Sequence, residues 1–363
     1  MKPPPRETAA GRGDHGRTLW LSTNWPAGDE SWITHLDLAT SDAYRPQSAR
    51  SVSASGCAVR EGPRGDPGRN RPGGARPDDA TQRRTIRRRE RLPGGPGTRP
   101  QEGALDRPRG PLPTCVSDLP PLPAAFEAAL EPGLAALASL GSPVTPEALS
   151  AIDGHVRLLL AWTEAINLTA IREPAEVAVR HVLDSLAALP VLRDRGIRRL
   201  LDIGSGGGFP GFPLAAALDA ERALLVDSVG KKVRFLQTMI AATGLEQSVG
   251  AERARAEHLA HDGRDRGAWP AVTARAVASL ADLVEVGLPL VAPGGVLVAW
   301  KGPSLDAELA AARPVLRALA AGRVEIVNVG LPGLGDHRLV VVERGGPIDP
   351  RYPRDPAERR RPL

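Results

Sequence analysis

The chain of 363 residues has few cysteines, few methionines and no long apolar run. Its two cysteines, Cys57 and Cys115, have no metal-ligand spacing and imply no disulfide framework. No stretch reaches the roughly eighteen consecutive apolar residues that indicate a transmembrane helix. The N-terminus also lacks the apolar core of a signal peptide. These absences predict a soluble, cytoplasmic protein with no metal site and no membrane partner, and we expect a monomer.

Residues 1–118 differ in composition from the rest of the chain. They contain 15 Pro and 15 Gly, and 20 Lys and Arg against 14 Asp and Glu. Such a segment cannot bury enough apolar surface to offset its chain entropy, so we predict that it is disordered. The remaining residues carry 27 basic and 28 acidic side chains. The basic pI therefore describes the extension and is weak evidence that the folded part binds nucleic acid.

Three interpretations of this extension stay open. Its arginine-rich run, Arg83–Arg89, could bind RNA, or the segment could be a regulatory tail. It could also be upstream DNA that is translated from a start codon assigned too early. The only methionines are Met1 and Met239, so a later start would use a non-ATG codon, for which Val116 is a candidate.

Helical spacing begins after the extension. Residues 123–140 are rich in Ala and Leu, Thr145 with Pro146 is a favourable start for a second helix, and a third starts at Glu173. These helices would form a cap on the domain that follows. The predicted division is a disordered extension at 1–118, a helical cap at 119–196, an α/β domain at 197–346 and a basic, irregular tail at 347–363.

From residue 199, apolar runs alternate with helical stretches, a pattern typical of a parallel α/β sheet. Only residues 330–337 separate the last two predicted strands, which suits a hairpin. We therefore expect an α/β fold, Rossmann-like, with seven mostly parallel strands and a terminal hairpin. The predicted strands cover 199–203, 223–227, 248–254, 271–275, 295–301, 323–329 and 338–344, with helices starting near Gly211, Lys231, Ala256, Ser279 and Ser304.

A glycine-rich turn follows the first predicted strand. Asp202 is followed by glycine at alternate positions, Gly204, Gly206 and Gly208. Glycine permits positive φ and close approach of a ligand to the backbone. A nicotinamide-binding turn would place its third glycine at position 209, which is Phe. The spacing instead favours a site for S-adenosyl-L-methionine, and the alternative is a glycine-rich turn without a ligand.

Acidic residues at the carboxyl ends of strands are candidates to bind this donor. Asp227 ends the second predicted strand, where a carboxylate can accept hydrogen bonds from both ribose hydroxyls. Asp202 could contact the methionine ammonium, or it could only orient the glycine turn. Ala256 and Glu257 follow the third strand and could contact the adenine, although a solvated glutamate at a helix start is the simpler interpretation of Glu257 by itself.

Two cations at strand ends are candidates to position the substrate. Arg275 ends the fourth predicted strand between Ala274 and Ala276, and Lys301 ends the fifth. Because the carboxyl ends of parallel strands share one edge, both would lie near the ligand and could hold a phosphate or the O6 of a purine. The alternative is that both are surface charges.

Two further groups of polar residues have open roles. His181 and Asp184 lie one helical turn apart beside Arg180, and a structural pair is the simpler interpretation than a catalytic histidine. Lys231, Lys232 and Arg234 begin the helix after Asp227. They form either a solvated helix face or a patch that binds RNA phosphates.

Seven sequence blocks occur in an order that resembles the RsmG family, also called glucose-inhibited division protein B. The resemblance covers about residues 120–363. It implies transfer of a methyl group from S-adenosylmethionine to N7 of a guanosine near the decoding region of 16S ribosomal RNA, within the small ribosomal subunit. The blocks begin at Asn167, Val179, Leu201, Leu225, Arg275, Lys301 and His337.

The resemblance also implies roles for individual residues. It assigns donor contacts to Gly204, Phe209, Ala256, Glu257 and Arg275. The tail at 352–363 resembles the basic tail of the family and implies RNA contacts for its arginines. However, the tail lacks the usual glycine, and the long extension has no counterpart in the family. The tail arginines are Arg359, Arg360 and Arg361.

The implied chemistry agrees with the residues at hand. Guanine N7 has an in-plane lone pair and no proton, so the reaction requires alignment and no general base. The sequence accordingly contains no compelling base constellation. The alternatives are a methyltransferase acting on a small molecule or a protein, and a non-catalytic module that binds the ribosome.

Overall fold

A computed structural model describes residues 33–37, 111–276, 278–361 and 363. All of them belong to one of the two compact units into which the chain divides; the other, 47–106, lies outside the described residues. The predictions for Cys57 and for the arginine run Arg83–Arg89 also lie outside them.

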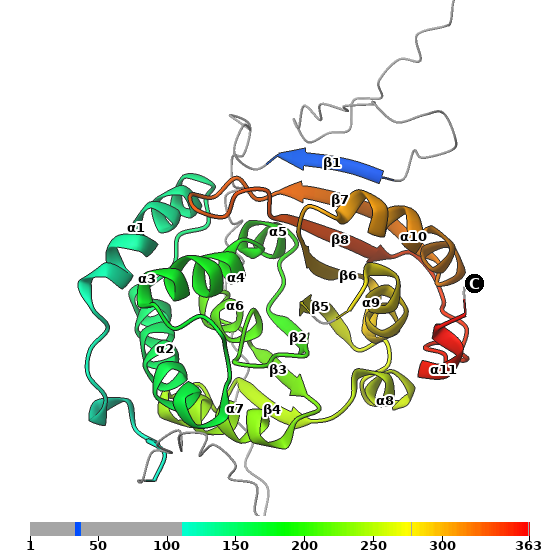
Figure 1. Cartoon of the computed structure of the whole chain (residues 1–363). Coiled ribbons are helices and arrows are strands. Elements are labelled where there is room, and N and C mark those ends of the chain that lie inside the picture. Colours follow the sequence, from blue (N-terminus) through cyan, green and yellow to red (C-terminus); the bar gives the residue numbers. More distant parts are fainter. Residues whose placement is uncertain (1–32, 38–110, 277, 362) are drawn as a thin grey trace, which may run out of the picture. The chain divides into compact units, whose positions relative to one another are not determined.

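The centre of the fold is an eight-stranded sheet in the order β1-β7-β8-β6-β5-β2-β3-β4 (Figure 1). β8 runs antiparallel to both of its neighbours, β6 and β7, and the other neighbouring pairs are parallel. The predicted terminal hairpin and mostly parallel sheet are thus confirmed. The strands are β1 (Ile33–Asp37), β2 (Arg199–Ile203), β3 (Arg222–Asp227), β4 (Val249–Arg253), β5 (Trp269–Arg275), β6 (Val291–Lys301), β7 (Ala321–Asn328) and β8 (Arg338–Arg344).

The prediction of seven strands is corrected to eight. Residues 33–37, which the composition placed in a disordered extension, pair in parallel with β7 along Val324–Asn328. The structure also describes residues 111–118, where the Trp162 side chain donates a hydrogen bond to the carbonyl of Pro113 at 2.8 Å. Disorder is therefore the wrong prediction for these two short segments.

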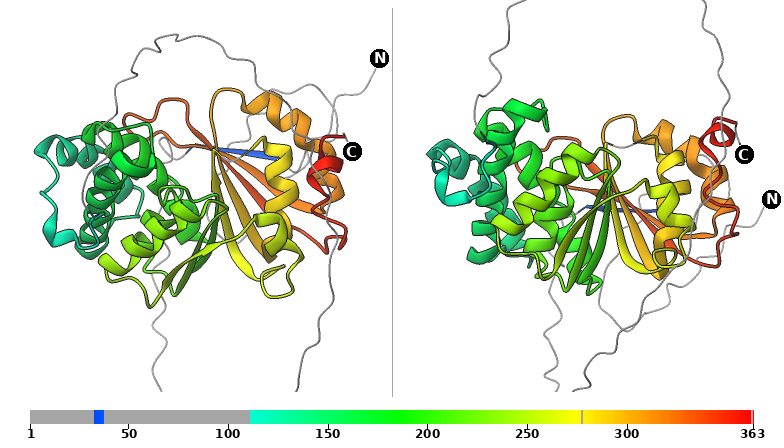
Figure 2. Two further views of the ribbon diagram at one scale, coloured as in Figure 1. Left: turned by 60° about the horizontal axis from the view of Figure 1, so that its bottom comes forward. Right: turned by 90° about the horizontal axis from the view of Figure 1, so that it is seen from below.

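The helices form two layers, one on each face of the sheet (Figure 2). The cap helices, α6 and α7 cover one face, and α8, α9 and α10 cover the other. The helices are α1 (Ala124–Ser139), α2 (Pro146–Ile166), α3 (Pro174–Val177), a π-helical segment η2 (Ala178–Leu183), α4 (Asp184–Leu186), α5 (Leu189–Asp194), α6 (Gly211–Ala217), α7 (Gly230–Ala242), α8 (Ala256–His261), α9 (Leu280–Gly287), α10 (Leu305–Ala318) and α11 (Pro356–Arg359), with single 3-10 turns at η1 (Val116–Asp118) and η3 (Leu288–Leu290).

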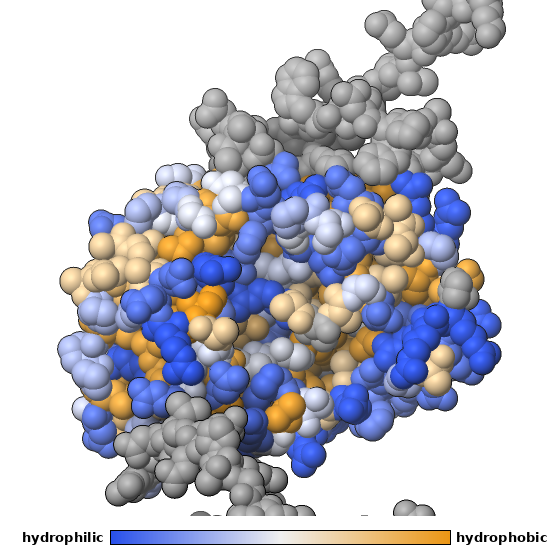
Figure 3. Space-filling view, in the orientation of Figure 1, coloured by the Kyte–Doolittle hydropathy of each residue, from blue (hydrophilic) through white to orange (hydrophobic). Residues whose placement is uncertain are grey.

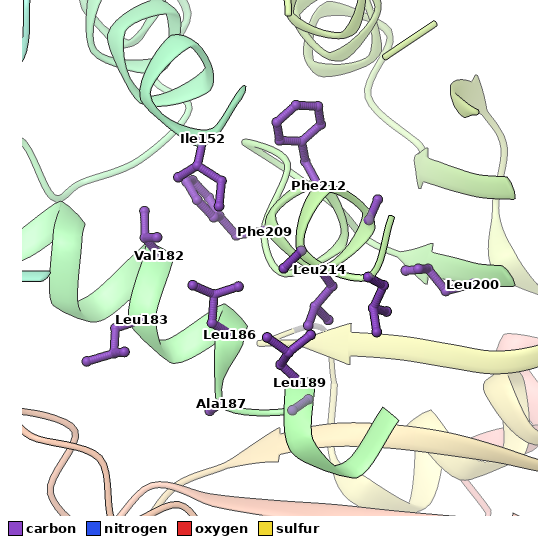
Figure 4. Packing of buried hydrophobic residues seen from close by; sticks show 14 of the residues in the cluster. Ile152, Val182, Leu183, Leu186, Ala187, Leu189, Leu200, Phe209, Phe212 and Leu214 are labelled. Carbon is purple, nitrogen blue, oxygen red and sulfur yellow. The ribbon is translucent and has the colours of Figure 1, made fainter. Parts of the chain in front are cut away.

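Alternation along the strands separates two apolar cores. Successive side chains of a strand point to opposite faces, so Leu200 joins the core under the cap and Leu201 joins the core under α9 and α10. Figure 4 shows the first core, in which Leu186 and Leu189 of the cap face α6, the helix that carries Phe212 and Leu214. Both faces are therefore covered, as a parallel sheet requires.

Helix boundaries follow local signals. α2 begins at the predicted cap, where the Thr145 hydroxyl accepts a hydrogen bond from the amide of Ala148 at 3.3 Å. It ends at Asn167, which has a φ of 52° in the left-handed region. α9 is capped in the same way by Ser279. These signals place the helices within a few residues of the predicted starts.

Candidate functional site

The glycine turn after β2 is held against the end of β3. The amides of Gly204 and Ser205 both donate to the carbonyl of Val226, at 2.8 and 3.0 Å. The three alternating glycines, Gly204, Gly206 and Gly208, have φ of 73°, 57° and 95°. These left-handed conformations explain why glycine recurs at alternate positions.

The Asp227 carboxylate connects this turn to the end of β3. One oxygen accepts a hydrogen bond from the amide of Gly206 at 3.0 Å, and the other accepts from the amide of Val229 at 2.8 Å. The Lys232 ammonium lies 3.7 Å away. Asp227 therefore fixes the turn and also lines a cavity.

The first cavity, of about 460 Å³, lies at the carboxyl ends of β2, β3 and β4. Its volume falls within the range of small-molecule sites. It brings together four residues that the sequence predicts to bind a donor, and it includes part of the C-terminal tail. Among its lining residues are Gly204, Asp227, Ala256, Glu257, Leu283, Pro356, Arg359 and Arg360.

Glu257, on the wall of this cavity, pairs with the tail. The guanidinium of Arg359 donates to a Glu257 carboxylate oxygen at 2.6 Å. Although burial opposes ionisation, a hydrogen bond from its own backbone and that from Arg359 lower the pKa of Glu257 below its usual value. Glu257 is therefore a paired anion and not the solvated surface glutamate that was the alternative.

The second cavity, of about 580 Å³, lies on the other side of the glycine turn. Gly204 lines both cavities. Phe209, Arg275 and Lys301, which come from three different segments, meet in the second one. Its further lining residues include Arg180, His181, Asp184, Gly206, Trp300, Glu308 and His337.

An aromatic stack supports the turn from below this cavity. The Phe209 ring lies between two imidazoles, with centroids 4.8 Å from His181 and 4.5 Å from His155. His155 is buried and donates to the carbonyl of Gly207 at 2.6 Å. A Cβ at Gly208 would lie 2.8 Å from His155, so packing as well as φ requires glycine there. Gly208 lines neither cavity.

His181 is suited to a structural role, as the simpler interpretation held. Burial first, and then the charge of Arg275, lower the pKa of His181 to about 4. Its ring lies 2.7 Å from the Thr169 hydroxyl and 3.4 Å from Arg275. It is therefore neutral near pH 7 and positions its neighbours.

Arg275 belongs to a charged network that includes Asp184 and His337. Its guanidinium donates to one oxygen of the Asp184 carboxylate at 2.7 Å, and His337 donates to the other at 2.9 Å. The hydrogen bond to Asp184 raises the pKa of His337. Arg275 also lies over the Phe209 ring at 5.5 Å. It is thus a paired residue of the cavity with a side chain only 14% exposed, and not a surface charge.

Lys301 is paired as well. Its ammonium donates to the Glu308 carboxylate at 2.7 Å and to the carbonyl of Ala278 at 2.9 Å. The lysine side chain is only 8% exposed. The two cations that the sequence placed at this edge therefore lie there, but each has a carboxylate partner.

Asp202 lines neither cavity. Its side chain is fully buried, and one carboxylate oxygen accepts from the Thr273 hydroxyl at 2.7 Å. Burial raises its pKa to about 6. Of its two predicted roles, the geometry is that of a residue that orients the turn.

The raised pKa of Asp202 makes a testable difference to stability. A carboxyl that titrates near pH 6 when folded and near pH 3.8 when unfolded loses stability as the pH rises through that interval. Relative to Asp202→Asn, the free energy of unfolding of the unaltered protein should fall by up to about 3 kcal/mol between pH 4 and pH 7. Urea denaturation of both proteins measures this difference, and parallel curves would contradict the raised pKa.

The predicted RNA-binding residues fall in two places. Lys231 and Arg234 are exposed on α7, and Lys232 lies beside Asp227. Arg359 and Arg360 line the first cavity, whereas Arg361 is exposed outside it. Arg359 and Arg360 thus belong to the wall of the first cavity, and Lys232 lies beside Asp227 of the same cavity.

Several contacts of the site were not predicted. Asp184 and His337 were noted in the sequence, but not as partners, and they are 153 positions apart. Glu308 lies on the helix after Lys301, and His155 comes from the cap helix α2. No local pattern marks these contacts, because each forms only in the tertiary fold.

Two kinds of feature are missing from the part of the chain that the structure describes. None of its helices combines the length and the apolar character needed to span a bilayer. Within the same residues, no cluster of three or more His, Cys, Asp or Glu side chains could ligate a metal ion.

Comparison with known proteins adds an independent line of evidence. Residues 148–333 match the family model described as GidB, rRNA small subunit methyltransferase G. The chain is 38% identical over 226 residues to ribosomal RNA small subunit methyltransferase G of Pelotomaculum thermopropionicum, covering 62% of this chain and 94% of the relative. It is 40% identical to the protein of that name from Stenotrophomonas maltophilia, covering 62% and 98%. A solved CurJ carbon methyltransferase aligns at 15% identity with a TM-score of 0.40, covering 61% of this chain and 67% of that one.

Proposed function

The chain belongs to the rRNA small subunit methyltransferase G family, and we propose that it methylates N7 of a guanosine in the decoding region of 16S ribosomal RNA. It is an S-adenosylmethionine-dependent methyltransferase with the class I fold. The observation that carries the proposal is the pair of cavities that meet at Gly204. One suits a donor nucleoside and the other suits a base.

The first cavity has the chemistry that an adenosine-containing donor needs. Asp227 and Glu257 supply carboxylate acceptors for hydroxyl or amino groups, and the alternating glycines leave room for a ligand against the turn. When bound, the donor supplies a methyl group on a positively charged sulfur. Gly206 and Phe209 line the second cavity and follow Gly204, which lines both cavities. We therefore assign them to the place where donor and substrate meet.

The second cavity fits a substrate that needs alignment and no base. Guanine N7 already has a free lone pair, so no proton has to be removed. His181 is neutral and held by its neighbours, and Arg275 is neutralised by Asp184. We propose that Arg275 and Lys301 position the guanosine indirectly, because their ion pairs fix Asp184 and Glu308 in the walls of this cavity.

Arg180 is the candidate for direct contact with an RNA phosphate. It lines the second cavity, its side chain is exposed, and no carboxylate pairs with it among the described residues. A guanidinium at the mouth of a cavity is well placed to bind a phosphate. We expect Arg180→Ala to raise the KM for small ribosomal subunits about tenfold, with little change in donor affinity.

Arg317→Ala is a matched control for this prediction. Arg317 is also exposed, but it lies at the end of α10 that is remote from the carboxyl edge of the sheet. Steady-state methylation of small subunits should be unchanged in this variant. Equal KM values for the two variants would exclude Arg180 from the RNA contact.

The cellular setting belongs to the same proposal. We propose that the protein acts in the cytoplasm, as a monomer, on 16S ribosomal RNA or on the small subunit. We propose that 119–196 is the cap, 197–346 the catalytic domain and 347–363 the tail. Lys231, Lys232 and Arg234 would add phosphate contacts beside the donor cavity.

Tritium transfer tests the substrate class. The full-length protein is incubated with methyl-tritiated S-adenosylmethionine and small subunits from a strain that lacks this methylation. We expect the label in 16S RNA. Label in ribosomal protein, or none with any particle or naked RNA, would favour a protein or small-molecule methyltransferase or a non-catalytic module.

A further inference from the structure

The C-terminal tail, described over residues 347–361, is docked on the domain. The Tyr352 side chain is fully buried. Arg266 donates to the carbonyls of Ala260 and Tyr352, both at 2.7 Å, and His261 donates to that of Pro353 at 2.9 Å. Side chains of α8 and of the loop after it thus donate to backbone carbonyls of the tail and fix its course.

A buried ion pair anchors the tail to α9. The Arg354 guanidinium binds both oxygens of the Glu285 carboxylate, at 2.9 and 2.8 Å, and the backbone amide of Arg354 adds a third hydrogen bond at 2.9 Å. Glu285 is only 3% exposed. Such bidentate geometry fixes position as well as charge, so the residues after Arg354 start from a defined point.

This anchor delivers α11 to the first cavity. Pro356, Arg359 and Arg360 line it, on the side where Figure 3 shows hydrophilic side chains gathered over α11. Arg359 is 10% exposed and holds Glu257, as described above. Its Nε is buried and has no hydrogen-bond partner in the described part of the chain. A buried donor without a partner is costly, and a ligand in the cavity could satisfy it.

We propose that residues 354–360 are a wall of the S-adenosylmethionine site, in which Arg359 holds the Glu257 carboxylate in place for the adenosine. The inference rests on the proposed use of the first cavity. It replaces RNA binding as the role of Arg359 and leaves Arg361 as the tail arginine free to contact RNA. Donor binding and tail docking then stabilise each other, because the docked tail forms part of the donor site and the bound donor contacts the docked tail.

Calorimetry with S-adenosylhomocysteine tests the role of Arg359 in the full-length protein. We expect Arg359→Ala to weaken binding about tenfold, as for loss of one charge-assisted contact. The matched control is Arg361→Ala, which removes an exposed arginine two positions away and should leave the affinity unchanged. Thermal denaturation of each variant reports whether the fold is intact.

A double-mutant cycle separates positioning from general stability. If Arg359 acts through Glu257, adding Arg359→Ala to Glu257→Gln should weaken binding much less than it does in the unaltered protein. Additive losses would overturn the proposal. So would unchanged affinity of Arg359→Ala together with weaker methylation of small subunits, the result expected of an RNA arm. Failure of the unaltered protein to bind S-adenosylhomocysteine would instead reject the proposed function.

Discussion

Gly204→Val is expected to abolish detectable donor binding, a loss of about 100-fold or more in affinity. Gly204 lines both cavities, has a φ of 73° and donates its amide to Val226. A β-branched residue is strained at that φ and would place methyl groups where donor and substrate meet. Calorimetry with S-adenosylhomocysteine measures the affinity directly.

Gly196→Val controls for the strain alone. Gly196 has a φ of 62°, and a Cβ there would meet nothing within 4 Å. It precedes β2 at the edge opposite the cavities. The two variants should lose similar stability from the backbone, but only Gly204→Val should lose the donor. Unchanged affinity in a folded Gly204→Val protein would reject this turn as the donor site.

Arg275→Ala is expected to lower methyl transfer about 100-fold. Arg275 holds the Asp184 carboxylate and the carbonyl of Arg180, and it lies over the Phe209 ring, so its loss disorganises one whole wall of the second cavity. Asp184 is buried, and among the described residues its carboxylate would keep only His337 as a hydrogen-bond partner. The free energy of unfolding should fall by about 3 kcal/mol.

Combining Arg275→Ala with Asp184→Asn separates these two effects. The neutral side chain can still accept from His337 but no longer leaves a buried charge without its arginine. Stability should largely recover in the double variant, whereas methyl transfer should not. Recovery of both would mean that Arg275 matters only for folding.

The sheet was largely predictable because its signals are local. Apolar runs broken by glycine placed β2 and β8 at their observed bounds, and the others within four residues at either end. β1 was missed for the opposite reason. Its five residues, Ile33–Asp37, lie in a segment that was predicted to be disordered from its average composition. Its partner β7 is almost 300 positions away. A short edge strand of that kind has no local signature.

The location of a site residue was predictable where it depends only on the course of the main chain. Strand ends and the glycine turn located Asp227 and Arg275 at the correct edge. Side-chain direction was not predictable for Asp202, which alternation along β2 turns into the interior. The partners of Arg275 and Lys301 depend on elements that converge only in the folded chain.

The tail shows the limit of reading charge from composition. The resemblance of the basic tail to that of the RsmG family implied RNA contact for three consecutive arginines near the end. The structure instead pairs Arg359 with Glu257, and the anchor that makes this possible is Glu285, an acidic residue inside an amphipathic helix. Whether a cation faces solvent or a carboxylate is decided by tertiary packing.

The position of the methyl group on the RNA is the sharpest test of the proposed function. Small subunits methylated by the protein are treated with borohydride and aniline, which cleave RNA at N7-methylguanosine, and the 16S RNA is mapped by primer extension. We expect one cleavage, at a guanosine in the decoding region, that requires both protein and donor. Methylated RNA that resists cleavage, or cleavage elsewhere, would exclude methylation of N7 at that site.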